Sequence, residues 1–160
     1  MEAARAATVA DLADVVRLAR DLRDELAAMR GGALWRAREA PPEPDDARYA
    51  DLSRAGDARL VVGTVDGTVV GFGSLEICPL RTGDRLGLIT ELYVEPAARS
   101  VGVGEAITTV LLAYADEHGC IGVDALALPG HRATKNFFET TGFTARALVM
   151  HRPSNTRSHA

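Results

Sequence analysis

The chain has 160 residues, of which 47% are hydrophobic and 25% charged, and its formal net charge is -4 at pH 7. This length fits one domain with its own core, and the mild acidity argues against nucleic acid as the main partner. No apolar run reaches the ~18 residues of a membrane helix, and Asp11 and Asp14 interrupt the stretch where a signal peptide would lie. Cys78 and Cys120 have no CxxC spacing, so we expect reduced thiols in a cytoplasmic protein.

The first third of the chain predicts a short strand followed by helices. Residues 3–8 favour the strand, and from Thr8 apolar residues recur at three- and four-residue steps, which indicates an amphipathic helix. Asp11 stands where it would complete a capping box with Thr8, and a pair of glycines ends the helix. The proline-rich residues 38–46 predict a loop, and a short helix is expected at about 46–55.

The middle of the chain predicts an antiparallel meander. Residues 59–65 and 68–77 flank Asp66-Gly67, which is a strong signal for a two-residue hairpin. A second turn at 81–84 leads into a further strand at 85–94. Three neighbouring strands are therefore expected in this part of the sequence.

The last third alternates helices and strands. A long helix is expected at about 99–118, followed by a strand at 121–128, which we expect to be central because it is mostly apolar. A short helix over 131–142 and a last strand over 143–152 complete the predicted elements.

The element order, β-α-α-β-β-β-α-β-α-β, predicts one mixed α/β domain over residues 1–152. An antiparallel meander feeds a β-α-β unit in this arrangement, and no internal repeat or linker interrupts it. Residues 153–160 are polar and are expected to form a disordered tail.

Two glycines, Gly102 and Gly104, stand in the turn before the long helix, where glycine lowers helix stability. A helix start presents unpaired N–H groups and a positive dipole end, so this turn could bind a phosphate. The alternative is a tight turn that packs the helix against its strand. A P-loop is excluded because no Lys follows the glycines, and Ile107 replaces the third glycine of a dinucleotide fingerprint.

The turn resembles the signature of the GNAT superfamily of acetyl-CoA-dependent N-acetyltransferases. That signature has Arg or Gln, two residues, Gly, one residue, and Gly or Ala at a helix start, and Arg99, Gly102 and Gly104 match it. Two further segments, "LYVEP" and "FFETTGF", are similar to family segments through Leu92, Val94, Pro96, Phe137, Glu139, Gly142 and Phe143. The resemblance covers roughly residues 1–152.

The resemblance implies the GNAT fold, a mostly antiparallel sheet of six to seven strands with splayed central strands and a β-α-β acyl-CoA unit. It implies acetyl-CoA as cosubstrate, with the pyrophosphate on the turn and the pantetheine arm between the splayed strands. The implied contacts are Leu92, Tyr93, Val94, Arg99, Ser100, Val101, Gly102, Val103, Gly104, Glu105, His131, Asn136 and Phe138. Many relatives have a second glycine at Ser100 and an asparagine at His131. The histidines show no metal-ligand spacing, so no metal is predicted.

The reaction that the resemblance implies is direct attack of a primary amine on the acetyl thioester in a ternary complex. A carboxylate must take the amine proton directly or through water. Glu91 is the leading candidate for this general base because it lies on the splayed strand, with Glu76 and Glu25 as alternatives. The other interpretation of Glu91 is a solvated carboxylate or one paired with Arg85 or Arg99.

The general acid is the main departure from the family pattern. Phe138 occupies the position where many relatives carry a tyrosine, and phenylalanine has no hydroxyl to donate. One alternative is that solvent protonates the leaving thiolate, and a second is that Tyr93, Cys120 or Asn136 substitutes for the tyrosine. The remaining alternative is that the protein binds acyl-CoA without efficient catalysis.

The sequence therefore predicts an N-acetyltransferase whose acceptor is a small-molecule or protein amine. The alternative is a non-catalytic acyl-CoA-binding or sensing module, and a tRNA-acylating toxin of the same fold is disfavoured by the acidic charge. Residues 26–52 are expected to cover the acceptor side, and their mixed charges select no acceptor. Dimerisation is common in the family, and the predicted strand at 143–152 could join the sheets of a homodimer.

Overall fold

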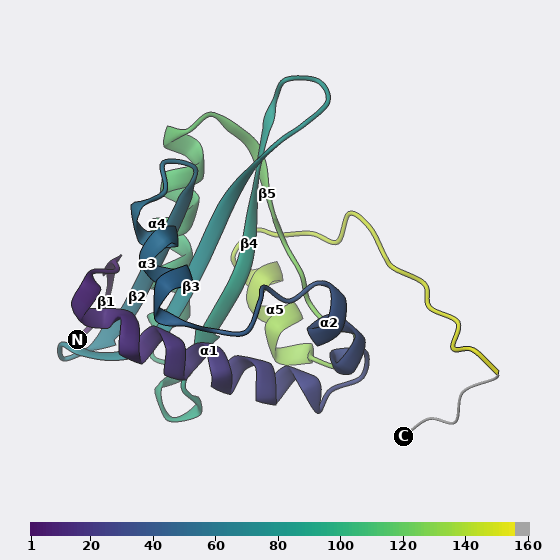
Figure 1. The fold of residues 1–160 in the computed structure, drawn as a ribbon, viewed down its shortest axis with the longest axis horizontal. Helices are drawn as coiled ribbons and strands as arrows, with labels where there is room; N and C mark the ends of the chain where they lie inside the picture. Colours follow the sequence, from purple (N-terminus) through teal and green to yellow (C-terminus); the bar gives the residue numbers. More distant parts are fainter. Residues whose placement is uncertain (156–160) are drawn as a thin grey trace.

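A twisted five-stranded sheet forms the framework of the molecule in the computed structural model, which describes residues 1–155 (Figure 1). The strands lie side by side in chain order, and every neighbouring pair is antiparallel except the parallel pair β4–β5. They are β1 (Glu2–Ala6), β2 (Ala58–Val65), β3 (Thr68–Pro79), β4 (Arg85–Val94) and β5 (Cys120–Ala125).

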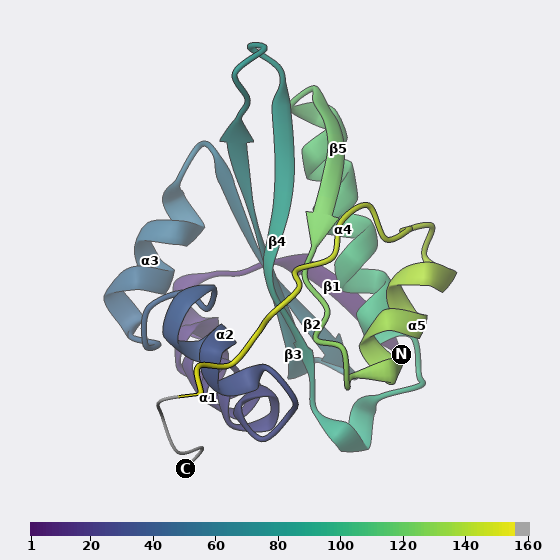
Figure 2. The same cartoon turned by 90° about the vertical axis from the view of Figure 1, so that its right-hand side faces the viewer.

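Helices cover both faces of the sheet (Figure 2). One face carries α1 (Leu12–Ala27), with α2 (Gly32–Arg38) and α3 (Asp46–Arg54) beside it, and the other carries α4 (Val103–Glu117) and α5 (Arg132–Thr140). Two short 3-10 turns, η1 (Val9–Asp11) and η2 (Pro96–Ala98), precede α1 and α4. Each face has its own apolar core, one centred on Phe72 under α1 and α3, the other on Ile107 and Leu111 of α4.

Several local predictions are confirmed by the structure. The Thr8–Asp11 capping box is present at the start of the first helical segment. Asp66 and Gly67 have φ values of 48° and 83°, the left-handed conformation that a tight hairpin between β2 and β3 requires. The bounds of β4 are those expected, 85–94.

The long helix and the loop before α3 differ from the prediction. The long helix begins at Val103 and not near residue 99, because Gly102 has a φ of 93°, which no helical residue adopts. The seven-residue helix α2 was not expected; it begins at the second glycine of the pair, Gly32, and ends at Arg38, where the proline-rich loop was predicted to begin, and Trp35 anchors it by burial.

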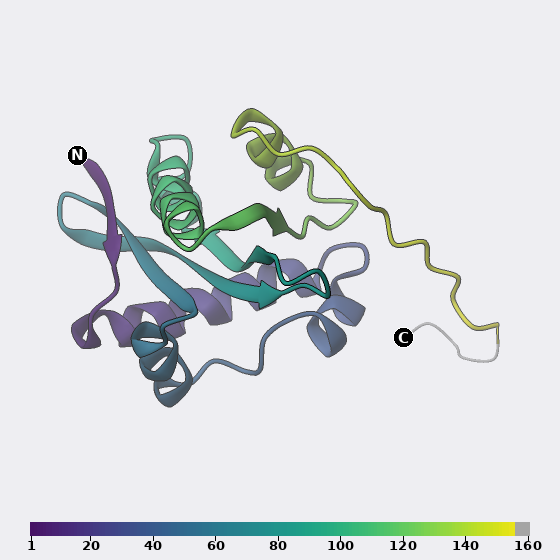
Figure 3. The same cartoon turned by 90° about the horizontal axis from the view of Figure 1, so that it is seen from above.

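The strand predicted at 143–152 is not formed, so the expected count of six to seven strands is wrong for the described residues. This segment has no strand partner there and extends away from the body of the molecule (Figure 3). We call it the C-terminal arm (residues 143–152). Its β-favouring side chains supply propensity only, and a strand also needs an edge to pair with. Because the arm does not pair, β5 lies at the edge of the sheet and not in its centre as expected. None of the described helices is long and apolar enough to cross a membrane.

Candidate active site

The central feature of the sheet is a gap between β4 and β5. Their pairing ends where Ile89 meets Ala125, while β4 continues to Val94. A bulge lies at the start of the gap, because Ser74 pairs with Glu91 and Leu75 pairs with Ile89, which leaves Thr90 without a paired residue in the β3–β4 register. The splayed strands expected from the sequence are therefore present.

The backbone of β4 faces this gap with unpaired groups. The Glu95 amide donates to the Val70 carbonyl on the β3 side. Because a strand presents its N–H and C=O groups to alternate sides, the amides of Val94 and Leu92 are directed into the gap. The Val94 carbonyl there accepts a hydrogen bond from Arg99 Nε at 2.8 Å. A polar chain could pair with β4 from this side.

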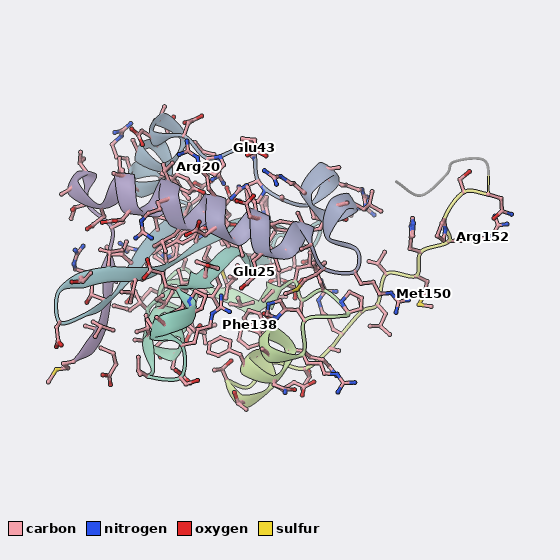
Figure 4. All side chains as sticks on the ribbon, turned by 90° about the horizontal axis from the view of Figure 1, so that it is seen from below. Arg20, Glu25, Glu43, Phe138, Met150 and Arg152 are labelled. Carbon is pink, nitrogen blue, oxygen red and sulfur yellow. The ribbon has the colours of Figure 1, made fainter. Side chains whose placement is uncertain are left out.

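A cavity of about 440 Å³ opens over the gap. Its walls come from the end of α1, from α2, from β4, from the turn before α4, from the segment after β5 and from α5. Figure 4 shows Glu25 of α1 and Phe138 of α5 labelled on these facing walls. Of the residues that the resemblance implies for acetyl-CoA, those that line the cavity are Leu92, Tyr93, Val94, Arg99, Ser100, Gly104, Glu105, His131, Asn136 and Phe138.

The turn before α4 is built to expose backbone. Ser100 and Gly102 both have left-handed φ values, 71° and 93°, and no side chain caps the first turn of the helix. The N–H groups at the start of this 15-residue helix are thus available to an anion, together with the positive end of its dipole. Val101 is half exposed and Val103 is buried in the core, and neither residue lines the cavity.

Gly104 has a packing role as well as a place in the cavity wall. A Cβ atom added there would lie 3.1 Å from the Phe137 ring of α5. The absence of a side chain therefore lets α5 approach the start of α4. The packing interpretation offered by the sequence is thus confirmed for Gly104, and close ligand approach at this turn stays a prediction.

Three polar side chains from different elements, Glu25, Arg99 and His131, meet at one wall of the cavity. Glu25 Oε1 accepts a hydrogen bond from Arg99 at 2.9 Å, and Glu25 Oε2 lies 3.6 Å from His131 Nε2. The other ring nitrogen of His131 accepts from the Thr134 amide at 3.0 Å and so caps α5. The cluster links the end of α1 to the starts of α4 and α5.

Glu91 is fully enclosed beneath the cavity. Its side chain is 0% exposed, and its carboxylate accepts hydrogen bonds from Tyr49 at 2.8 Å and Arg23 at 3.0 Å. Arg48 and Ser74 each approach the other oxygen at 3.3 Å. Burial and the neighbouring Glu91 charge raise the pKa of Tyr49 far above its usual value, so its phenol stays protonated and donates. Neither the solvated carboxylate nor the Arg85 or Arg99 pairing considered from the sequence is present.

Phe138 is buried in the core of the α4 face and reaches the cavity wall. Its ring packs against Phe143 with centroids 5.0 Å apart and against Phe137 at 5.5 Å. Tyr93 also lines the cavity, and burial raises the pKa of its phenol, which therefore remains protonated at neutral pH. Glu76 and Cys120 do not line the cavity.

Comparison with known proteins places this geometry in context. The sequence profile described as the acetyltransferase (GNAT) family matches residues 20–143, which is more than half of the chain. The chain belongs to the GNAT family. The comparison with curated proteins found no significant match.

Solved structures share this GNAT fold along nearly the whole chain. An acetyltransferase from Trypanosoma brucei is 25% identical, with a TM-score of 0.67 and 96% of this chain and 100% of that chain covered. Glucosamine-6-phosphate N-acetyltransferase from Arabidopsis thaliana is 19% identical, with a TM-score of 0.70 and coverage of 96% and 98%. The aminoglycoside N-acetyltransferase AAC(6')-Iy in complex with CoA is 15% identical, with a TM-score of 0.75 and coverage of 97% and 95%. Because the last two structures are only 19% and 15% identical to this chain, they support its fold and not its activity.

The sequence did not reveal the partners that surround Glu91 in this GNAT domain. They come from α1, α3 and β3, and only tertiary structure brings them together: Arg23, Arg48, Tyr49 and Ser74. One signal was available. Arg23 follows Val16 and Ala19 by seven and four residues, so it lies on the apolar stripe of its helix, where a charged residue needs a buried partner.

No group of three or more metal-ligating side chains is found among the described residues. This observation concerns the described part of the chain alone. The prediction of a metal-free reaction therefore stays a prediction.

Proposed function

We propose that the protein transfers the acetyl group of acetyl-CoA to a primary amine. The observation that carries this proposal is the gap between β4 and β5, which leads from unpaired β4 amides to the uncapped start of α4. An acyl-CoA molecule needs both features in one cavity. Its pyrophosphate needs N–H donors, and its pantetheine amides need a strand edge to pair with.

The residues present fit acetyl-CoA at each end of the cavity. At the turn, the backbone from Val101 to Glu105 would hold the pyrophosphate, and Arg99 adds a positive charge beside it. In the gap, the Leu92 and Val94 backbone would pair with the pantetheine arm. Asn136 and Phe138 on α5 would form the opposite wall. Acetyl-CoA supplies the thioester; the chain supplies position, hydrogen bonds and exclusion of water.

We infer that the Leu92 amide stabilises negative charge on the thioester oxygen. This amide faces the gap beside the bulge at Thr90, and a preorganised backbone donor in a water-poor site lowers the barrier to acyl transfer. The acceptor nitrogen forms a bond to the carbonyl carbon, the carbon–sulfur bond breaks, and the thiolate takes its proton from solvent. With a pKa near ~8.5, a thiolate leaves without a strong acid.

The role of Glu91 follows from its enclosure. We propose that Glu91 positions β4 and the loop before α3, and that the amine proton leaves through water or through Glu25, which is partly exposed in the cavity. The two Glu91 oxygens already accept hydrogen bonds from Arg23, Arg48, Tyr49 and Ser74, so no lone pair is left to take a proton from a substrate. Glu25 thereby replaces Glu91 as our leading candidate for the general base.

The acceptor belongs on the side of α1 and α2, where Leu22, Leu26 and Trp35 line the cavity. This surface is apolar except for one carboxylate, Glu25. It therefore suits a small amine whose remaining groups are apolar or only partly polar. The names of two structural relatives, acetyltransferases for aminoglycosides and for glucosamine-6-phosphate, are consistent with a small-molecule amine. A protein amine stays an alternative acceptor, and the cytoplasmic location stays a prediction.

We also propose a homodimer formed through the C-terminal arm. The arm carries three consecutive exposed apolar residues, Leu148, Val149 and Met150, which are 83%, 83% and 87% exposed. β5 presents an unpaired edge, and its own Ile121 side chain is exposed. An unpaired edge and an unpaired strand-forming segment in one chain are complementary between two copies.

Thermal unfolding with and without ligand tests the proposed function. Saturating CoA or acetyl-CoA is expected to raise the melting temperature by mass action, whereas NAD and ATP should have much smaller effects. Absence of a shift at millimolar CoA would overturn the proposal. A panel of amines, followed by the release of CoA thiol, then separates an enzyme from the alternative motivated by Phe138, a non-catalytic acyl-CoA-binding module.

A further inference from the structure

Arg99 is held by three groups on the acceptor side of the cavity. Its Nε donates to the Val94 carbonyl at 2.8 Å, and one terminal nitrogen donates to Glu25 at 2.9 Å. Its guanidinium also lies over the Tyr93 ring, 5.3 Å from the centroid. The residue itself stands at the entrance to the turn of α4, three positions before Gly102. It can therefore reach either the Glu25 carboxylate or a ligand on the turn.

Glu25 needs a cation at its position. It lies in the last turn of α1, where the negative end of the helix dipole disfavours a carboxylate. Its side chain is 26% exposed and lines the cavity. Arg99 supplies a full positive charge, and His131 Nε2 lies farther away at 3.6 Å. Loss of Arg99 would leave Glu25 open to another cation from the cavity.

We propose that Arg99 transfers from Glu25 to the pyrophosphate when acyl-CoA binds, and that the released Glu25 then binds the ammonium group of the acceptor. This inference rests on the proposed function. A pyrophosphate is a stronger partner for a guanidinium than one partly exposed carboxylate, because it accepts two parallel hydrogen bonds and carries more charge. The acceptor class is thus a cationic amine, and acyl-CoA binding precedes and strengthens amine binding.

The other carboxylates around the cavity do not offer this exchange. Glu91 is enclosed by Arg23 and Arg48 and has no exposed side-chain surface. Glu105 lies on the first turn of α4, on the side of the anion site and away from the acceptor wall. Glu25 therefore combines access from the cavity with a partner that acyl-CoA can remove.

Calorimetric titration with CoA tests the Arg99 transfer without relying on turnover. Glu25→Gln removes the competitor for Arg99, so the affinity for CoA should rise by about fivefold, the low end of typical coupling between sites. Asp24→Asn is the matched control, since it removes the same charge from the neighbouring residue, which is exposed and pairs with Arg36. CoA affinity of the control should stay within twofold of wild type.

A double-mutant cycle separates transfer of Arg99 from a general charge effect. In the Arg99→Gln background, Glu25→Gln should no longer raise CoA affinity. An equal rise in both backgrounds, or no rise in wild type, would overturn the transfer. If wild-type protein binds no CoA at all, the proposed function fails instead, so the two failures are distinguishable.

The acceptor half is tested with butylammonium chloride against sodium chloride at equal ionic strength. Coupling between two ligands is reciprocal, so butylammonium should tighten CoA binding at least twofold in wild type and not in Glu25→Gln. Equal CoA affinities in the two salts would show that Glu25 does not take up an ammonium group, and would overturn this half of the proposal.

Discussion

Arg23 and Glu91 form a buried ion pair that joins α1 to β4 beneath the candidate active site. The two side chains are 1% and 0% exposed, and their nearest nitrogen and oxygen lie 3.0 Å apart. Arg23 also donates to the carbonyls of Ala19, Pro41 and Pro42, so it fixes the proline-rich loop as well as the strand. Its Nε has no hydrogen-bond partner. The pair thus links the proline-rich loop to the β4 bulge.

Neutralising Glu91 should lower the free energy of unfolding by more than would be expected if Glu91 were an unpaired catalytic base. Glu91→Gln leaves the buried Arg23 charge uncompensated, which typically costs about 3–5 kcal/mol. Urea unfolding measures this loss, with Glu76→Gln on the adjacent strand as a control expected to change stability by no more than about 0.5 kcal/mol. A stable Glu91→Gln variant that binds CoA and loses only kcat would restore Glu91 as the general base.

A negative charge on the turn of α4 should weaken CoA binding. Ser100→Asp places a carboxylate at the proposed pyrophosphate site, whereas Ser100→Asn has the same shape without the charge, and both residues tolerate the left-handed φ of 71°. CoA affinity of the aspartate variant should be at least tenfold lower than that of the asparagine variant, about 1.4 kcal/mol. Calorimetry with both folded variants checks this, and equal affinities would place the anion elsewhere.

A hydroxyl at position 138 tests the missing general acid. If thiolate departure limits the rate, Phe138→Tyr should raise kcat by up to the ~10²-fold low end of acid catalysis, with CoA affinity unchanged. Phe143→Tyr is the matched control, because that ring packs on Phe138 without lining the cavity. Weaker CoA binding in a folded Phe138→Tyr protein would indicate that the new hydroxyl is buried without a partner, at about 1–3 kcal/mol.

The N-terminal segment should make stability depend on acid pH. Hydrogen bonds from Arg5, at 2.7 and 3.0 Å, and from the Thr8 amide lower the pKa of Asp11 from 3.8 to about 2. A lowered folded-state pKa stabilises the protein above the unfolded value, and this stabilisation is lost as the pH falls from about 4 to about 2. Because Arg5 is half exposed and screened by solvent, we expect the loss to be about 1–2 kcal/mol.

Urea unfolding across this pH range measures the Asp11 contribution. Asp11→Asn should flatten the pH dependence, and Asp14→Asn, which changes an exposed carboxylate of α1, should leave it unaltered. Identical pH profiles for wild type and Asp11→Asn would contradict the assignment.

The C-terminal arm should control the oligomeric state. The double variant Leu148→Asp and Met150→Asp places two charges on the exposed part of the arm, which Figure 4 shows far from the body at Met150 and Arg152. Sedimentation is expected to give a dimer for wild type and a folded monomer for the variant, because a charged segment cannot be buried against a second copy. A wild-type mass of 17.0 kDa, that of one chain, would rule out the homodimer.

The sequence alone determined the local structure and the family. Hydrophobic periodicity located β4 and the long helices, Asp66-Gly67 fixed the hairpin, and the Arg99–Gly104 turn identified the family signature. These features are readable because the responsible interactions lie within a few residues along the chain, as in capping, left-handed turns and the alternation of strand side chains. The proposed pyrophosphate site was predictable for the same reason, because most of it is backbone at one strand-to-helix turn.

Tertiary structure alone decided the environment of each carboxylate and the fate of the arm. Glu91 and Glu25 are chemically alike in the sequence, yet one is enclosed by Arg23 and the other faces the cavity between Arg99 and His131. Burial and ion pairing depend on residues as far apart in the sequence as Glu25 and His131, which no local pattern encodes. Likewise, the arm at 143–152 has the composition of a strand, but a strand also needs a pairing partner, and within one chain the arm does not pair with the free edge of β5.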